Sequence, residues 1–127
     1  MPVQVTAIML GVENLDRSKA FYETLGGAIE QDYPQFVRLS LGEGSSSLAL
    51  YPREATAADA GVSPEGSGFR GVSFHHLVPN NEDVERVMKE AEAAGAQIVK
   101  PVEATGWGSF GYFSDPDGYL WKVASSG

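Results

Sequence analysis

The sequence predicts an α+β fold of two βαβββ modules whose curled mixed sheets enclose a central cavity. One observation is the order of segments: a strand, a helix and three strands occur twice along the 127 residues. The other is a shared register, because Val12 precedes the first helix and Val78 the second, with Ala7 and Ser73 standing five residues before each valine. Paired units of this kind leave room for a ligand in the trough between their sheets.

The first module is predicted within residues 1–60. Apolar and β-branched residues are typical of strands, and turn-forming residues separate the runs. Asn14 or Asp16 is expected to cap the helix, because both side chains accept hydrogen bonds from free N–H groups at a helix start. Gly26 is expected to end it. The predicted elements are a strand over 3–12, a helix over 17–26 and strands over 27–33, 35–41 and 46–52.

The second module is predicted within residues 69–127, after a short helical turn and a linker in the Ala-, Gly- and Ser-rich segment 53–71. Asn80 or Asn81 is expected to cap its helix. Apolar residues recur there at i, i+3, i+4 and i+7, the pattern of an amphipathic helix, at Val84, Val87, Met88 and Ala91. The predicted elements are a strand over 71–78, a helix over 82–95 and strands over 96–102, 110–114 and 119–124. The two modules together are expected to form one domain over 1–127.

Composition narrows the class of function. The net charge of −8 disfavours nucleic acid as a partner, because phosphate binding needs clustered Lys and Arg. The same acidity either serves solubility alone or attracts a cationic ligand or partner. No apolar run reaches the roughly 18 residues of a membrane helix, and the N-terminus lacks the basic region of a signal peptide. The chain has no cysteine. We therefore expect a soluble, cytoplasmic protein that binds neither nucleic acid nor membrane.

Four stretches together resemble the vicinal oxygen chelate superfamily, which includes glyoxalase I, bleomycin-resistance proteins, fosfomycin-resistance proteins and extradiol dioxygenases. They are LGVENLDRSKAFYETLGG, LALYPRE, DPDGYLWKV and the repeat itself. The resemblance covers nearly the whole chain, and the order of these stretches carries it, since DPDG alone is only a good turn. It implies the paired modules, a central cavity and a homodimer, in which modules are sometimes exchanged between chains.

The resemblance also implies positions for a divalent metal, held by His or Glu on the first and last strand of each module. In this sequence the four positions are Ala7, Ala49, Ser73 and Lys122. Alanine has no donor atom, a serine hydroxyl is a poor ligand, and a lysine ammonium repels a cation, whereas a divalent ion prefers imidazole or carboxylate. We therefore expect no metal and no other cofactor, and we carry over none of the family's metal-dependent activities.

Two histidines, His75 and His76, are the remaining candidates for a metal. Adjacent strand residues point to opposite faces, so one ion can hardly take both. If Ser73 faces the cavity, His75 does too, as a cavity-lining polar group or as structural filler, while His76 is expected to be a hydrogen-bonded or partly buried structural residue. Trp121 alternates away from Lys122 and is expected to pack under a helix.

Alternation along the strands, with the aromatic loop near residue 107, predicts a mostly apolar pocket with few polar groups. The predicted ligand-binding residues are Met9, Tyr51, Ser73, His75, Trp107, Phe110, Tyr112 and Lys122. Lys122 either pairs with an anionic group or extends to solvent. The aromatic side chains either stack on a flat ring, face a cation or fill the trough.

The function expected from these residues is metal-free binding or sequestration of a small organic molecule in the central cavity. The alternative is an enzyme of the same fold, lyase-like or dioxygenase-like. It would use an unrecognised metal site or residues outside the family's set, with Lys122, His75 and Tyr51 as acid, base or electrostatic stabiliser. A third class is an interaction module in which the fold serves as a scaffold.

Overall fold

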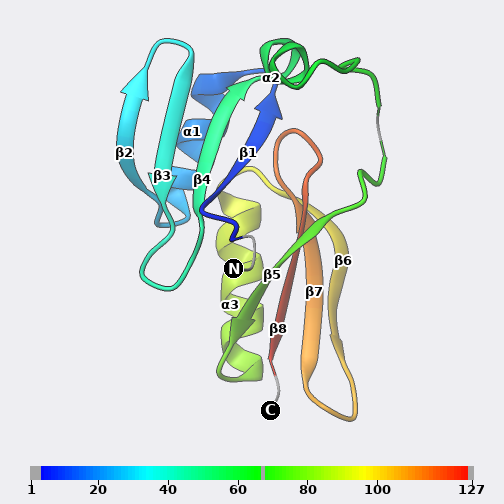
Figure 1. Ribbon diagram of the computed structural model, residues 1–127. Helices are drawn as coiled ribbons and strands as arrows, with labels where there is room; N and C mark the ends of the chain where they lie inside the picture. The colour runs from blue at the N-terminus through cyan, green and yellow to red at the C-terminus, as the bar shows by residue number, and fades with distance from the viewer. Residues whose placement is uncertain (1–3, 67, 126–127) are drawn as a thin grey trace. The chain divides into compact units, whose positions relative to one another are not determined.

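The computed structural model describes residues 4–66 and 68–125 and contains two compact units, Met1–Glu65 and Gly66–Gly127. Each unit is a βαβββ module, which confirms the predicted α+β class and the repeat (Figure 1). The division falls inside the segment that the sequence left between the modules. That the two modules form one domain over 1–127 stays a prediction. No helix among the described residues is long and apolar enough to cross a membrane.

The N-terminal unit has a four-stranded sheet in the order β1-β4-β3-β2, in which β1 and β4 are parallel and the other pairs antiparallel. Its elements are β1 Ala7–Val12, α1 Leu15–Thr24, β2 Ala28–Tyr33, β3 Phe36–Ser40, β4 Ser47–Pro52 and α2 Arg53–Ala60. Asn14, one of the two predicted caps, starts α1 by accepting a hydrogen bond from the Arg17 N–H at 3.0 Å. The predicted short turn after residue 52 is a full helix, α2, which ends at Gly61 in the left-handed conformation.

One face of the N-terminal sheet carries the core of that unit. Phe21 and Tyr22 of α1 are each 2% exposed. The sheet residues that share their burial alternate along the strands, as expected for a sheet with one covered face; they are Leu10, Val12, Val37, Leu39, Leu48 and Leu50. At the helix edge, Asp32 of β2 raises the pKa of Lys19 in α1 by accepting a hydrogen bond from its Nζ at 2.6 Å.

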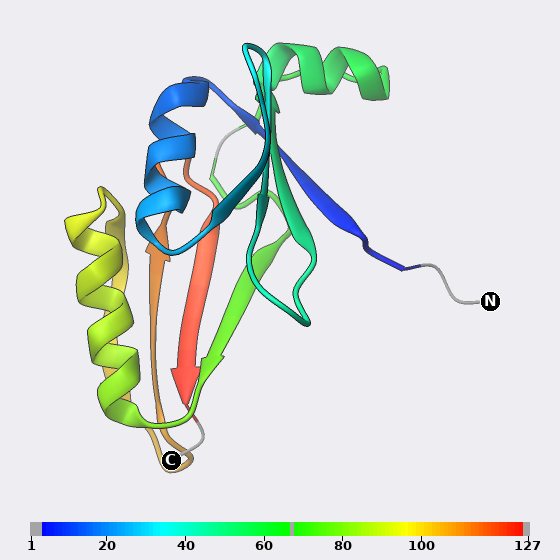
Figure 2. The same ribbon diagram turned by 90° about the vertical axis from the view of Figure 1, so that its left-hand side faces the viewer.

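The C-terminal unit repeats the topology, with the sheet order β5-β8-β7-β6 and a parallel β5–β8 pair. Its elements are β5 Ser73–Val78, α3 Asn81–Ala93, β6 Gln97–Ala104, β7 Ser109–Ser114 and β8 Leu120–Ser125. Figure 2 shows α3 along one face of this sheet. Asn80, not Asn81, caps α3 by accepting from the Asp83 N–H at 2.9 Å. Val84, Met88 and Ala91 are buried, as the helical pattern predicts.

Gly111 shows which residues of the C-terminal sheet face α3. A Cβ built on this residue of β7 would lie 2.9 Å from Cε of Met88, so a side chain there would collide with the helix. Phe113, two residues further along β7, therefore faces α3 as well. Trp121 lies opposite Phe113 in the register and stacks on it at 6.1 Å between ring centroids. Trp121 therefore lies on the face of the sheet that α3 covers, as predicted, and the residues beside it in the strand face the other way.

The two units match at the level of strand register. In the N-terminal unit Met9 lies opposite Ala49, and in the C-terminal unit His75 lies opposite Lys122. Met9 and His75 are 66 positions apart, the same offset that relates Ala7 to Ser73. Because the backbone pairing is equivalent, Ala49 and Lys122 hold corresponding positions in the two modules. The register inferred from the sequence is thus the register of the structure.

Candidate ligand-binding site

Lys122 lies on β8 on the face of the C-terminal sheet opposite α3, and it is half-buried. Its Nζ is 5.0 Å from the ring centroid of Phe110, 5.7 Å from that of Trp107 and 6.0 Å from that of Tyr112. An ammonium within about 6 Å of a ring face is attracted by the negative face of the π system. The lysine of the DPDG strand is therefore held among three aromatic rings.

Two features of the backbone assemble these rings. Tyr112 lies directly opposite Lys122 in the β7–β8 register, and Phe110 lies two residues along the same strand face. Trp107 comes from the β6–β7 loop, where Thr105 Oγ1 accepts hydrogen bonds from the N–H groups of Trp107 at 3.2 Å and Gly108 at 3.1 Å. This turn presents the indole beside Phe110, with nearly parallel rings 5.9 Å apart.

His75 lies beside Lys122 on the same face, since the two are partners in the parallel β5–β8 pair. Its Nε2 is 3.2 Å from the Oγ of Ser73. Both observations agree with the predicted orientation of Ser73 and His75 toward one face. His76 points to the opposite face of β5, as predicted, and it is exposed. Of its two predicted roles, hydrogen-bonded or partly buried, the second is therefore wrong. The reason is that β5 is an edge strand.

In Figure 1 the β6–β7 loop lies at the end of the sheet where β5 and β8 finish. A hollow of about 220 Å³ is formed by residues of these three segments. It is lined by His75, Leu77, Val78, Trp107, Lys122, Ala124 and Ser125. Three of the predicted residues line it directly: His75, Trp107 and Lys122. Phe110 and Tyr112 support Lys122 from the neighbouring strand, and Ser73 reaches it only through His75.

Four lining residues were not predicted. Leu77 and Ala124 follow His75 and Lys122 by two residues, so alternation carried one step further along each strand predicts them. Val78 and Ser125 alternate to the other face of the sheet. They line the hollow nevertheless, because each is the last residue of its strand. Ser125 also belongs to a small polar network, in which its Oγ contacts Oδ1 of Asn81 at 2.5 Å and accepts from the Ser109 N–H at 3.3 Å. No signal in the sequence indicates these contacts.

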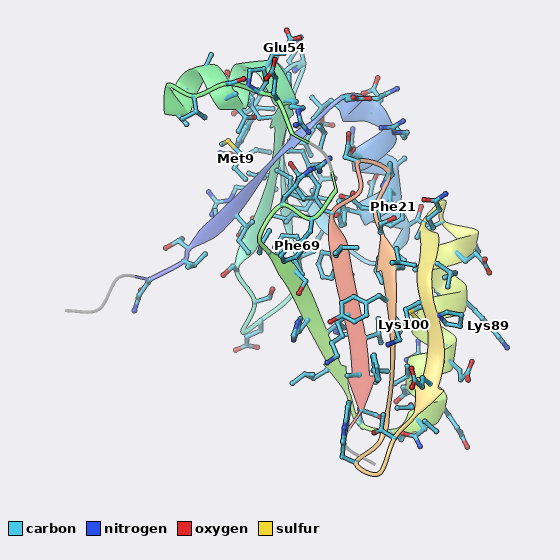
Figure 3. The ribbon with its side chains drawn as sticks, turned by 90° about the vertical axis from the view of Figure 1, so that its right-hand side faces the viewer. Met9, Phe21, Glu54, Phe69, Lys89 and Lys100 are labelled. Carbon is cyan, nitrogen blue, oxygen red and sulfur yellow. The ribbon has the colours of Figure 1, made fainter. Side chains whose placement is uncertain are left out.

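Met9 and Tyr51 lie in the N-terminal unit, on the face of its sheet that carries Ala7 and Ala49 (Figure 3 labels Met9 on β1). Met9 is 45% exposed, and Tyr51 makes an edge-on contact with Phe36 at 6.3 Å. Both side chains point to the face that the sequence assigns to the ligand. Their part in ligand binding stays a prediction.

The residues at the family's metal positions do not form a chelating set. Ala7 and Ala49 share one face of the N-terminal sheet, and Arg38 lies opposite Ala49, with its Nε 3.5 Å from Oε1 of Glu30. Ser73 and Lys122 share one face of the C-terminal sheet. Among residues 4–66 and 68–125 no three His, Asp or Glu side chains gather closely enough to hold an ion. The donors needed by a divalent metal are therefore not present at these positions.

Comparison with known proteins agrees with this fold. The family described as Glyoxalase/Bleomycin resistance protein/Dioxygenase superfamily matches residues 4–123. An uncharacterized protein of Mycolicibacterium smegmatis is 35% identical over 98 residues, which are 76% of this chain and 72% of that protein.

Solved structures of known proteins share this fold. A glyoxalase-related enzyme from Fulvimarina pelagi is similar with a TM-score of 0.84 and 31% identity, covering 96% of this chain and 87% of that one. A lactoylglutathione lyase from Agrobacterium tumefaciens has a TM-score of 0.70 at 21% identity, covering 98% and 94%, and so shows the fold alone. The paired modules, their matched register and the family match over residues 4–123 lead to one conclusion: this chain belongs to the glyoxalase/bleomycin resistance protein/dioxygenase superfamily.

Proposed function

We propose that this protein binds a small organic molecule without a resident metal, and that it holds or sequesters the ligand in the hollow beside Lys122. The observation that carries the proposal is the surrounding of Lys122. A residue that the family resemblance places at a metal position is here an ammonium among three aromatic rings, at the edge of an open hollow.

The make-up of the hollow supports a binding role. Small-molecule sites are concave and mostly apolar, with a few polar groups that orient the ligand. Leu77, Val78 and Ala124 supply the apolar wall, and Trp107 supplies a ring face at the rim. His75, Lys122 and Ser125 supply the polar groups. Trp107 is 52% exposed, so a bound ring would cover surface that now faces water and gain the hydrophobic contribution of that area.

One contact favours the alternative, an enzyme that uses residues outside the family's set. Ser73 Oγ and His75 Nε2 are 3.2 Å apart, which is the spacing of a nucleophile and its base. A working pair of this kind needs a third group that orients the base, and no such partner of His75 is found in the described part of the chain. A fluorophosphonate probe is therefore expected to leave Ser73 unlabelled. Labelling of Ser73 that disappears in His75→Ala would establish the enzyme instead.

The proposal is tested on the purified protein in two measurements. Elemental analysis is expected to find no stoichiometric divalent metal, and melting curves with added nickel, zinc, manganese or ferrous iron are expected to coincide with the curve without metal. Titration with small aromatic compounds, followed by amide and indole chemical shifts, is expected to perturb Trp107, His75 and Lys122. Truncation of Trp107 to Ala should weaken binding by about tenfold or more, as for aromatic anchors in general.

The matched control is Tyr33→Ala, which removes an aromatic side chain of the N-terminal unit that is 60% exposed and does not line the hollow. It should leave the titrations unchanged. A stoichiometric metal in the purified protein would contradict the proposal, and so would a panel in which no compound perturbs the hollow. The homodimer, the cytoplasmic location and the absence of nucleic-acid and membrane partners stay predictions.

A further inference from the structure

The charge of Lys122 is not balanced by the protein around it. Three other cations have carboxylate partners: Lys19 is 2.6 Å from Asp32, Lys100 is 3.4 Å from Glu103, and Arg86 contacts Asp83 and Glu90. Among residues 68–125 of the C-terminal unit, no carboxylate lies within ion-pair distance of the Nζ of Lys122. It is also the one lysine or arginine among the residues that line the hollow, and none of these residues is Asp or Glu.

The aromatic rings hold this ammonium without neutralising it. Ring faces attract a cation through their quadrupole, but each such contact is weaker than a charge-assisted hydrogen bond to an anion. Lys122 is also half-buried, so it has lost part of the water that would otherwise solvate its charge. The hollow therefore presents an apolar and aromatic wall with one uncompensated positive charge beside it.

We infer that the ligand of this site is a small aromatic anion, a carboxylate or phenolate whose charged group lies against Lys122 and whose ring lies against Trp107. This inference rests on the proposed function. The anion supplies the counter-charge that Lys122 lacks, and His75 adds a second polar group on the same wall. A cationic ligand, which the net charge of the chain favours, is opposed here, because its charge would meet the ammonium at short range.

The net charge of −8 does not cancel this local preference. The repulsion of an anion by distant carboxylates is screened over roughly 8 Å at physiological ionic strength. A carboxylate in direct contact with Nζ is screened far less. The acidity of the chain is therefore expected to slow the approach of an anion, while Lys122 determines how long the anion stays.

The size of the hollow limits the ligand. Sites for drug-sized molecules are commonly about 300–1,000 Å³. At about 220 Å³, this hollow fits one small ring system with a short charged group rather than a long or branched molecule. Benzoate and 2-naphthoate are probes of this class. Benzamide and 2-naphthamide have nearly the same shape without the charge, and benzylammonium reverses the charge.

The test compares these five compounds on the wild-type protein and on variants, by chemical-shift titration. The wild type is expected to bind each acid about ten- to a hundredfold more tightly than its amide, the range of a hydrogen bond to a charged group, and to bind benzylammonium least. Lys122→Met is expected to remove the preference for the acids while the amides bind as before. Lys122→Arg keeps the charge and is expected to keep the preference.

Lys100→Met is the matched control. Lys100 also contacts the ring of Phe110, at 4.9 Å, but it has Glu103 as its partner and does not line the hollow (Figure 3 labels Lys100). Its removal should leave the preference unchanged. If acids and amides bind the wild type equally, the inference fails while the proposed function stands. If none of the five compounds binds at concentrations up to solubility, the proposed function fails with it.

Discussion

The double substitution Ser73→His with Lys122→Glu is expected to create a divalent-metal site in the C-terminal unit. Residues 73 and 75 lie two apart on β5 and face the same way, and residue 122 lies opposite His75 on β8. The variant would therefore place two imidazoles and one carboxylate on a single sheet face, which is the number of protein ligands in many zinc sites. This double substitution is expected to give the site the ability to chelate a metal ion, which Ser73 and Lys122 do not provide.

The measurement is isothermal titration with nickel or zinc, together with melting curves at several metal concentrations. The double variant is expected to bind one ion per chain. At a free metal concentration a hundredfold above Kd, binding contributes about 2.7 kcal/mol to the free energy of unfolding, so the melting temperature should rise with metal. The wild type should show neither effect, because a hydroxyl and an ammonium replace two of the three ligands.

Controls separate this site from adventitious binding. Each single substitution should bind metal much more weakly than the double variant, and adding His75→Ala to the double variant should return it to the wild-type behaviour. If the wild type takes up a metal as tightly as the double variant does, the interpretation of Lys122 is wrong. A folded double variant that binds no metal would show that these three side chains do not come close enough to coordinate one ion.

Leu39→Ala is expected to lower the free energy of unfolding by about 2–5 kcal/mol, the usual cost of truncating a fully buried leucine. Leu39 lies on β3 with 0% exposure, and a Cβ on Gly27 would come within 3.1 Å of it, so the space around it is filled on several sides. The cavity left by the truncation cannot collapse easily in such packing, and the lost contacts add to the lost burial.

Chemical unfolding, followed by circular dichroism, measures this difference. Leu77→Ala is the matched control, because it removes the same atoms from a leucine that is 75% exposed on β5. We expect it to change the free energy of unfolding by no more than about 0.5 kcal/mol. Equal effects of the two substitutions would contradict the assignment of the core to the face of the N-terminal sheet that carries Leu39.

Local signals were enough to predict most of the fold. The buried face of α3 followed from the spacing of Val84, Met88 and Ala91, because helical periodicity depends only on neighbouring residues. Helix starts were predicted to within two positions, since Asn14 and Asn80 cap through their own side chains. The helix after residue 52 was underestimated as a short turn, because its Ala-rich sequence has a high helical propensity but little amphipathic pattern.

The candidate site was predicted only in part. The sheet face toward which His75 and Lys122 point was predicted from the alternation of side chains along each strand, which depends on strand geometry alone. The resemblance and the shared register identified Ala49 and Lys122 as corresponding residues before their pairing was known. The exposure of His76 was missed, because the pattern of one strand does not say whether that strand lies at the edge of its sheet.

The sequence by itself determined the two modules, their register and the residue types at the family's metal positions, because each depends on residue type and spacing. Only the tertiary structure decided which groups surround Lys122. The distance from its Nζ to Trp107 depends on the turn of the β6–β7 loop, and the distances to Phe110 and Tyr112 depend on the pairing of β7 with β8. The same packing leaves Lys122 without a carboxylate partner among residues 68–125 of its own unit. Charge balance at a side chain is a property of its neighbours in space, and the order of residues along the chain does not specify it.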